Sequence, residues 1–235
     1  YFQTKKKLTP AQKEDIEKSD VKVYENFYIE QKLTNGSTIR FFKNRKEVDK
    51  VCLMNGKMPK KSGEIAVDRM YADNNELKVG DTVKSRKKTF RITGLVALSD
   101  YSALFQNNND TMFDAVKFGV AIVTDKDFEA LNQVKVQYNY AWIYDKKPAT
   151  EKKEKKMAED LMEDMADVVT IESFVPQYQN QSIHFTGDDM GSDRAMIVML
   201  LYIVMAILAF VFGITISNTI RKEAGVIGTL RASGY

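Results

Sequence analysis

The chain has 235 residues, of which 44% are hydrophobic and 29% are charged, and this composition is typical of a globular protein. Its formal net charge of +3 is too small to indicate nucleic-acid binding, because the Lys-rich stretches also contain acidic residues and no nucleic-acid motif is recognisable. The single Cys and the single His exclude an intrachain disulfide, a zinc site built from cysteines and a metal site built from several histidines. We therefore expect Cys52 and His184 to be structural.

The N-terminal part predicts a capped helix. Residues 1–3, YFQ, match the end of a protease tag site, which suggests an expression remnant. In the following LTPAQKEDIEK segment, Thr9 is the expected N-cap and Pro10 suits the first helical position. Gln12 completes the spacing of a capping box, so a helix begins here.

A hairpin and a β-rich stretch follow. Residues 21–33 alternate as one strand, and the Asn-Gly turn within 34–37 joins this strand to a partner at 38–42. Residues 45–113 then consist of short segments separated by Gly, Lys and Asn, which is typical of a compact β-structure. Residues 105–114 within this stretch read as a polar loop.

The next part alternates strands with helices. The predicted elements are a buried strand at 116–124, a helix at 125–134 capped by Asp125, a strand at 136–145, a helix at 149–167 and a strand at 168–176. The helix at 149–167 is the clearest, because Met157, Leu161 and Met165 form one narrow apolar stripe that is expected to pack against a sheet.

This order of elements predicts an α+β fold. Residues 1–44 and 114–176 are expected to form an α/β layer, and residues 45–113 an inserted β-rich module. Residues 177–194 are a polar stalk that leads to the strongest compositional break in the chain.

The run at 195–220 contains no charged residue. As a helix it is about 39 Å long, which exceeds the hydrocarbon core of a bilayer at about 30 Å. The alternative, a buried core helix, seldom stays apolar all round over such a length. We therefore predict one transmembrane helix at 195–220.

The charges beside this run predict its orientation. Arg221, Lys222 and Arg231 follow the run, whereas Arg194 before it is set among aspartates. The positive-inside rule then places residues 221–235 in the cytosol and the large domain outside the cell. An exported domain needs an export signal, and none is visible, so we expect an upstream membrane segment beyond this chain.

The sequence offers no motif for chemistry. A Walker A loop and a G-x-S-x-G motif are absent, and no carboxylate pair stands out from the charged background. Asp188 and Asp189 are adjacent acids of the kind that is usually solvated. We expect neither an enzyme nor a cofactor or metal site in this chain.

Two segments carry a resemblance to a known family. The tail NTIRKEAGVIGTLRASGY resembles the segment after the second span of FtsX/MacB-like permeases of ABC transporters, with the pattern N-x-I-x-x-R-x-x-E-I-G-[VI]-L-[RK]-A-x-G. The matching residues are Asn218, Ile220, Glu223, Gly225, Val226, Leu230, Arg231, Ala232 and Gly234. Residues 53–96 are similar to the extracellular core of the same family, in which G-x-x-P-x-x-x-x-E-[IV]-x-[IL] precedes L-x-[VI]-G-D-x-[VIL] and I-x-G-[IV]. The matching residues are Gly56, Pro59, Glu64, Ile65, Val79, Gly80, Asp81, Ile92 and Gly94.

The resemblance implies a permease subunit in a bacterial cell membrane. A first span would precede the extracellular domain, further spans would follow the tail, and the outer domain would be a porter-like α/β layer with a β-rich insert. The implied partners are the lipid membrane, a second permease half or subunit, and a cytosolic ABC ATPase that binds and hydrolyses ATP. The implied substrate is a peptide, a lipid or an antibiotic; some members of the family instead regulate a cell-wall hydrolase.

The same resemblance names candidate residues for coupling to the ATPase. These are Arg221, Lys222, Glu223, Gly225, Gly228, Arg231 and Gly234, which lie on the cytosolic side of the predicted span. The charged residues would pair with an ATPase surface, and the glycines would permit tight packing or a helix end. A second interpretation stays open, in which the chain is a single-pass extracellular sensor or binding domain with a short cytosolic tail.

Overall fold

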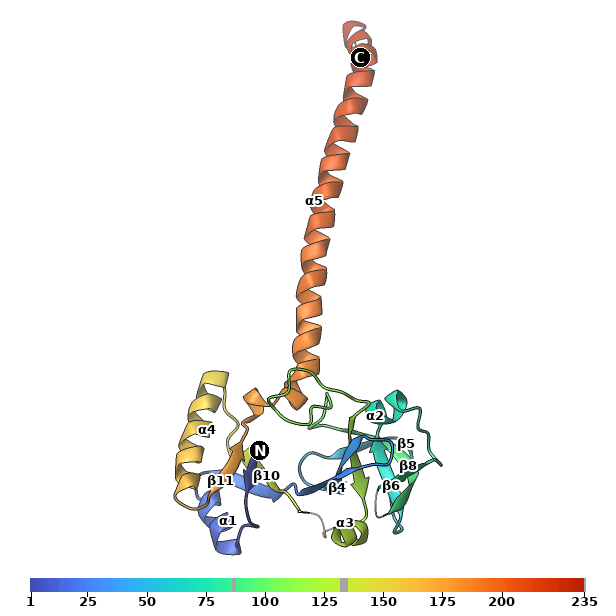
Figure 1. Cartoon of the computed structure of the whole chain (residues 1–235). Helices are drawn as coiled ribbons and strands as arrows, with labels where there is room; N and C mark the ends of the chain where they lie inside the picture. The colour runs from blue at the N-terminus through green and yellow to red at the C-terminus, as the bar shows by residue number, and fades with distance from the viewer. Residues whose placement is uncertain (86–87, 132–134, 235) are drawn as a thin grey trace. The chain divides into compact units, whose positions relative to one another are not determined.

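The protein is described by a computed structural model that covers residues 1–85, 88–131 and 135–234. The chain forms two compact units, Tyr1–Thr186 and Gly187–Tyr235. The first unit is an α+β fold with two sheets, and the second consists of the greater part of one long helix (Figure 1). The predicted fold class of an α+β domain followed by one apolar helix is confirmed.

The smaller sheet has four antiparallel strands. Their order is β11 (Ile171–Phe174), β1 (Phe2–Thr4), β10 (Tyr138–Tyr144) and β2 (Val21–Glu25). Helices α1 (Pro10–Glu17) and α4 (Glu151–Ala166) pack on this sheet. The core between them contains Ile16 of α1 and Leu161 and Met165 of α4. Two members of the predicted apolar stripe are thus confirmed, whereas the third, Met157, is only half-buried.

The larger sheet has seven strands. Six of them lie in the order β3 (Tyr28–Lys32), β4 (Thr38–Lys43), β9 (Phe118–Val123), β6 (Glu64–Asp68), β8 (Thr89–Leu98) and β5 (Val51–Gly56), and β7 (Thr82–Lys84) pairs with β8. The pairs β4–β9 and β6–β8 are parallel, and the other pairs are antiparallel. Helices α2 (Arg69–Asn74) and α3 (Asp125–Leu131) contribute Tyr71, Ala72, Phe128 and Leu131 to its core.

Local signals place several elements where they were predicted. The Thr9 side chain accepts a hydrogen bond from the Gln12 N–H at 3.2 Å, and the Gln12 side chain accepts one from the Thr9 N–H at 3.0 Å. The capping box at the start of α1 is therefore confirmed. The hairpin is confirmed as well, because β3 pairs with β4 across the turn that contains Gly36 at φ 88°.

Residues 1–3 belong to the fold. Phe2 lies in β1 between β10 and β11 and is only 1% exposed. Its ring stacks on Tyr140 with centroids 5.1 Å apart. Residues 1–3 are therefore part of the folded unit, because a side chain in the centre of the smaller sheet fills part of the core. Their origin as an expression remnant stays a prediction.

The single strand predicted at 21–33 is two strands. Residues Val21–Glu25 form β2 of the smaller sheet, and Tyr28–Lys32 form β3 of the larger one. The sequence alternates through both strands because the backbone stays extended where it passes from one sheet to the other. Asn26, which lies at this crossing, is buried.

The sheets also divide the chain differently from the predicted domains. Strands β3, β4 and β9 fall within the predicted α/β layer at 1–44 and 114–176, yet they share one sheet with β5–β8 of the predicted module at 45–113. The antiparallel pairing of β6 with β9 makes the module part of a continuous sheet. Only β1, β2, β10 and β11 form the separate smaller sheet.

Helix α3 is capped by Thr124 rather than by Asp125. The Thr124 hydroxyl accepts a hydrogen bond from the N–H of Asp127 at 3.2 Å, and Asp125 lies in the first turn. Helix α3 ends at Leu131, and the last residues of the helix predicted at 125–134 lie outside the described residues.

Helix α5 spans Gln181–Ala232. By length and composition it is the one helix among the described residues that is suited to cross a membrane. The predicted stalk at 177–194 is a 3₁₀ turn at Gln177–Gln179 followed by the beginning of α5. A polar segment of this kind shows no apolar period, so its helical structure could not be predicted from the sequence.

Gly119 of β9 limits how closely the larger sheet and α2 approach each other. A Cβ at this position would lie 2.5 Å from Cδ2 and 2.9 Å from Cβ of Tyr71, whose side chain is fully buried. We predict that Gly119→Ala lowers the free energy of unfolding by about 1–3 kcal/mol through overpacking. Chemical denaturation measures this change, and a variant with the stability of the parent would contradict the prediction.

Candidate functional site

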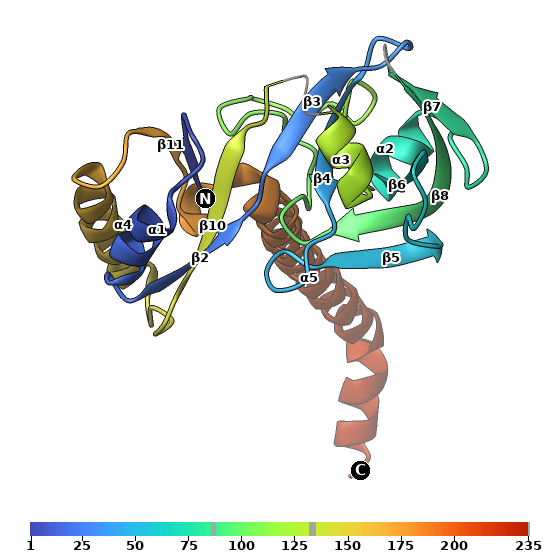
Figure 2. The ribbon, with the colours of Figure 1, turned by 90° about the horizontal axis from the view of Figure 1, so that it is seen from below.

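A short two-stranded ribbon joins the two sheets. Residues 26–28 lie antiparallel to residues 137–139 (Figure 2). The Asn26 N–H donates to the Asn139 carbonyl at 2.9 Å, and Tyr28 and Gln137 exchange two backbone hydrogen bonds of 3.2 and 2.9 Å. The ribbon is narrow, so the side chains around it contribute to holding the two sheets together.

A buried ion pair lies beside the ribbon. Arg45 follows β4, and its guanidinium donates to both carboxylate oxygens of Asp100, which follows β8, at 2.6 and 2.8 Å. The two side chains are 6% and 4% exposed. Arg45 also donates to the Asn26 side chain at 3.1 Å. The bidentate pair therefore ties the loops after β4 and β8 to the ribbon.

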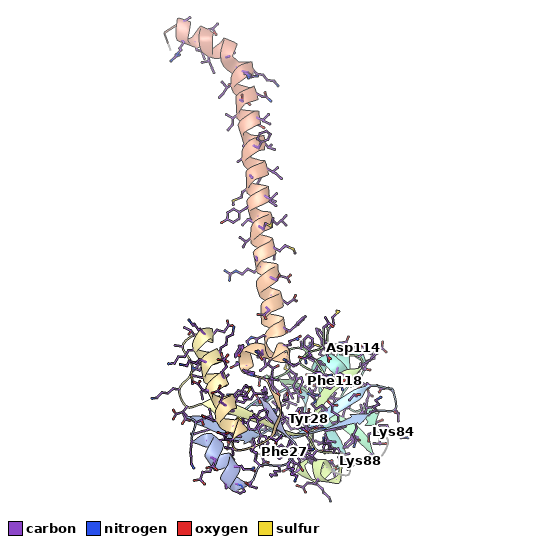
Figure 3. The ribbon with its side chains drawn as sticks, turned by 60° about the vertical axis from the view of Figure 1, so that its left-hand side comes forward. Phe27, Tyr28, Lys84, Lys88, Asp114 and Phe118 are labelled. Carbon is purple, nitrogen blue, oxygen red and sulfur yellow. The ribbon has the colours of Figure 1, made fainter. Side chains whose placement is uncertain are left out.

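A second buried cation, Arg40 of β4, lies within the same region. Its guanidinium donates to Glu30 Oε1 at 2.5 and 2.9 Å, to the Tyr101 hydroxyl at 2.6 Å and to the Gln106 carbonyl at 2.8 Å. The ring of Tyr28 lies 4.2 Å from this guanidinium, and the ring of Phe118 lies 5.1 Å from it; Figure 3 labels both rings. Arg40 thus fixes the loop that follows β8 onto the larger sheet.

The tyrosines of this region are neutral. Burial raises the pKa of the Tyr101 hydroxyl to about 12, although the positive charge of Arg40 opposes this shift. Burial also raises the pKa of Tyr28, again against the effect of Arg40. Both hydroxyls stay protonated at physiological pH, so the charges near the arginines come from carboxyl groups. Besides Glu30 and Asp100 these include Asp49, whose pKa is raised by burial and by the negative charge of Asp100.

The loop after β8 holds the first turns of α5, which we call the root (residues 181–186). The Ser102 hydroxyl donates to the carbonyls of Ser182 at 2.8 Å and Ile183 at 3.0 Å, and the Thr186 hydroxyl donates back to the Ser102 carbonyl at 3.1 Å. The Asn108 side chain accepts from the Gln181 N–H at 3.0 Å. The Gln181 side chain donates to the Asn108 carbonyl at 2.6 Å.

Aromatic rings of the loop after β8 also pack against the root. Phe105 and Phe113 of the loop and Phe185 of the root form a cluster with centroids 5.3–5.7 Å apart. The three pairs are tilted edge to face, which is a favourable geometry for aromatic rings. Hydrogen bonds and ring contacts together make the root part of the compact unit Tyr1–Thr186.

A polar cavity of about 430 Å³ lies between the ribbon, this loop and the segment that precedes the root. Its walls include Asn26 and Asn139 of the ribbon, Arg40 and Tyr101. Asn180, directly before the root, also lines it and is 9% exposed. The cavity thus borders the buried arginines and the beginning of α5.

The residues predicted for ATPase coupling all lie far along α5 or after it. All seven are exposed. Gly225 and Gly228 lie inside the helix, where an added Cβ would meet open space, and Gly234 follows the helix with φ 88°. Within the described part of the chain, Arg221, Lys222, Glu223 and Arg231 form no ion pair, so the structure brings none of them together with another charged group.

The single cysteine and the single histidine of the chain occupy different surroundings. Cys52 is exposed on β5. His184 lies in the root, and its Nε2 is buried without a hydrogen-bond partner among residues 1–85, 88–131 and 135–234. The same residues contain no group of three or more His, Cys, Asp or Glu side chains that could hold a metal ion.

The buried arginines at the centre of the site were not predicted from the sequence. Arg40 stands inside the apolar strand segment TIRFF, and an arginine in a buried strand requires a partner, so the signal was present. The partner Glu30 lies opposite Arg40 on β3 of the predicted hairpin, but the partner Tyr101 comes from the loop after β8, which only the folded chain brings to β4. The neighbouring Asp100 pairs with Arg45 in the same way. The sequence predicts an ordinary polar loop at 105–114, whereas in the structure Asn108 and Phe113 of this loop contact the root.

Comparisons with known proteins identify similar solved structures. No protein-family model matches the sequence, and no curated protein matches it. The chain is similar to the periplasmic region of MacB from Actinobacillus actinomycetemcomitans, with 13% identity over 73% of this chain and 86% of that chain and a TM-score of 0.36. It is also similar to the extracellular domain of the noncanonic ABC-type transporter YknZ from Gram-positive bacteria, with 12% identity over 74% of this chain and 97% of that chain and a TM-score of 0.35.

The Arg45–Asp100 pair is predicted to dominate the stability of the inter-sheet region. Arg45→Met leaves the Asp100 carboxylate buried without its partner, so we expect a loss of about 3–5 kcal/mol in the free energy of unfolding. Arg45→Met combined with Asp100→Asn should recover part of this loss because the unpaired charge is gone. The matched control is Lys43→Ala in the exposed pair with Glu129, where the side chains are 41% and 69% exposed and the expected loss is below about 1 kcal/mol. Equal losses for both pairs in urea titrations would contradict this prediction.

Asn108 is predicted to control the stability of the root. Asn108→Ala removes the acceptor of the Gln181 N–H, so this amide should exchange with solvent about tenfold faster, equivalent to a lost hydrogen bond of about 1.4 kcal/mol. The neighbouring Asn109→Ala is the control, because the Asn109 side chain has no hydrogen bond to the described residues. Hydrogen exchange followed by NMR or mass spectrometry measures both variants. Unchanged exchange in Asn108→Ala would show that the loop does not hold the root.

Proposed function

We propose that this chain is the extracellular domain and one membrane span of a permease subunit of a bacterial ABC transporter. In this proposal α5 carries movement between a cytosolic ATPase and the extracellular domain, for export or for mechanical signalling to an extracellular partner. ATP is bound and hydrolysed by the separate ATPase, and this chain performs no catalysis.

The attachment of the α5 root to the folded domain carries the proposal. A helix that serves only as an anchor needs no fixed attachment to its domain, whereas this root is held by the Ser102, Asn108 and Thr186 hydrogen bonds and by the aromatic cluster. Displacing the root therefore displaces the loop after β8, and through Arg40 and Arg45 it acts on both the larger sheet and the ribbon. Such contiguous packing is the physical requirement for passing a movement through a protein.

The tail supports the same proposal through its sequence. Its resemblance to the segment after the second span of FtsX/MacB-like permeases supports a role for Glu223 and Arg231 in contacts with the ATPase. In the structure both side chains are exposed and free of ion pairs with the described residues, as expected for groups that await a partner. The basic flank of the apolar run also favours a cytosolic location for this tail.

A single-pass extracellular binding domain is the second candidate. The polar cavity favours it, since a sensor needs a ligand site and no ATPase. The native open reading frame separates the two functions. Further spans after Tyr235 with a neighbouring ATPase gene would exclude the single-pass protein, and a stop codon soon after Tyr235 would exclude the permease.

Charge substitutions in the tail test the coupling directly. We predict that Glu223→Ala combined with Arg231→Ala reduces stimulation of the partner ATPase by about fivefold or more without loss of expression, because the tail loses its charged contacts. The control is Arg194→Ala, which removes a charge from the opposite end of the apolar run. The assay compares ATP hydrolysis by the reconstituted native permease and ATPase. Full stimulation in the double variant would remove the proposed role of these residues.

A further inference from the structure

The polar cavity is lined mainly by carboxamide side chains. They come from the ribbon and β1, from the loop after β8 and from the segment before the root. These residues are Gln3, Asn26, Gln106, Asn107, Asn108, Asn109, Asn139, Gln179 and Asn180. A carboxamide offers a carbonyl acceptor and two N–H donors in one plane, so the cavity presents both kinds of hydrogen-bonding group from several directions.

The charges at the cavity are compensated within the protein. Arg40 and Asp100 are its only charged lining residues among the part of the chain that the structure describes. Arg40 is paired with Glu30, and Asp100 is held in a bidentate pair by Arg45. A charged ligand would therefore find no free counter-charge, whereas an uncharged ligand meets no electrostatic penalty.

Part of the hydrogen-bonding capacity is unused. The side chains of Asn109, Asn139 and Asn180 make no hydrogen bond to the described residues, although all three line the cavity. Asn180 is 9% exposed, so little of its amide reaches bulk solvent. Asn139 is half-buried and Asn109 is exposed. Their free donors and acceptors can therefore be reached from the cavity by a ligand that supplies both kinds of hydrogen-bonding group.

The aromatic rings around the cavity are engaged elsewhere. Tyr28 stacks on the Arg40 guanidinium, Phe174 stacks on Trp142 at 4.8 Å between centroids, and Phe105 belongs to the aromatic cluster. The cavity thus offers few apolar surfaces for the side chains of a peptide. A saccharide suits it better, because its hydroxyl groups both donate and accept hydrogen bonds on all sides.

We propose that the polar cavity binds an uncharged saccharide. Its volume of about 430 Å³ lies within the range of small-molecule sites and suits a short oligosaccharide. Asn109, Asn139 and Asn180 supply hydrogen bonds to its hydroxyl or acetamido groups. The proposal goes beyond the proposed function and does not depend on it, since it concerns the extracellular unit and requires no ATPase.

NMR titration of the full chain tests the proposal. The ¹⁵N-labelled chain is kept in a detergent whose head group is not a sugar, and the probes are N,N′-diacetylchitobiose, maltotriose and an N-acetylated tripeptide amide. We expect a saturable shift of the side-chain amide signals of Asn109, Asn139 and Asn180 with at least one saccharide and none with the peptide. Absence of a saturable shift with both saccharides, or saturation by the peptide alone, would overturn the proposal.

Isosteric variants locate the site. Asn139→Leu and Asn180→Leu each remove a carboxamide while keeping its size, and each should weaken saccharide binding about tenfold. The control is Asn55→Leu on β5, which is exposed and does not line the cavity, and it should bind as the parent does. Thermal unfolding checks that the variants are folded. If a variant does not fold, the titration of the side-chain amide signals of the parent chain decides whether the cavity binds a saccharide. Parent affinity in both folded cavity variants would overturn the proposal.

Discussion

The compact unit Tyr1–Thr186 depends on two buried arginines. Arg45 pairs with Asp100 and bonds to Asn26 in the ribbon, while Arg40 pairs with Glu30 and holds the loop after β8. Taking such charges out of water is expensive, and pairing with a carboxylate offsets part of this cost. Apolar side chains would contribute stability at a similar volume but would not fix a loop in one direction. The arginines therefore specify where the loop after β8 lies, and the root of α5 takes its position from that loop.

This arrangement links the proposed function to physical contacts. A movement of the root reaches Ser102 and Asn108 by hydrogen bonds and Phe105 by ring packing. From there it reaches the arginines and the ribbon, which joins the two sheets by a few backbone hydrogen bonds. The ribbon is thus a narrow joint between two well-packed cores. Such a joint changes shape more easily than the cores do, since each core resists deformation.

The polar cavity lies at this same joint. Its walls come from both sheets, from the loop after β8 and from the segment before the root, so a change in the joint changes the distances between its carboxamides. A bound saccharide would in turn favour one arrangement of the joint, because linkage between a ligand and a conformational change is reciprocal. Both proposed functions, a permease subunit and a single-pass binding domain, are thus compatible with this structure. What distinguishes them is whether the tail after α5 meets an ATPase.

The sequence by itself determined the elements whose signals are local. The capping box at Thr9, the Asn-Gly hairpin turn, the stripe of α4 and the apolar run all depend on residues within a few turns of each other. Tertiary structure decided the rest. Alternation through 21–33 could not show that the chain changes sheets at Asn26, because both strands have the same period. Nor could spacing pair Arg45 with Asp100 or bring the loop after β8 to the root, since these contacts join segments far apart in the chain and arise only when the core forms.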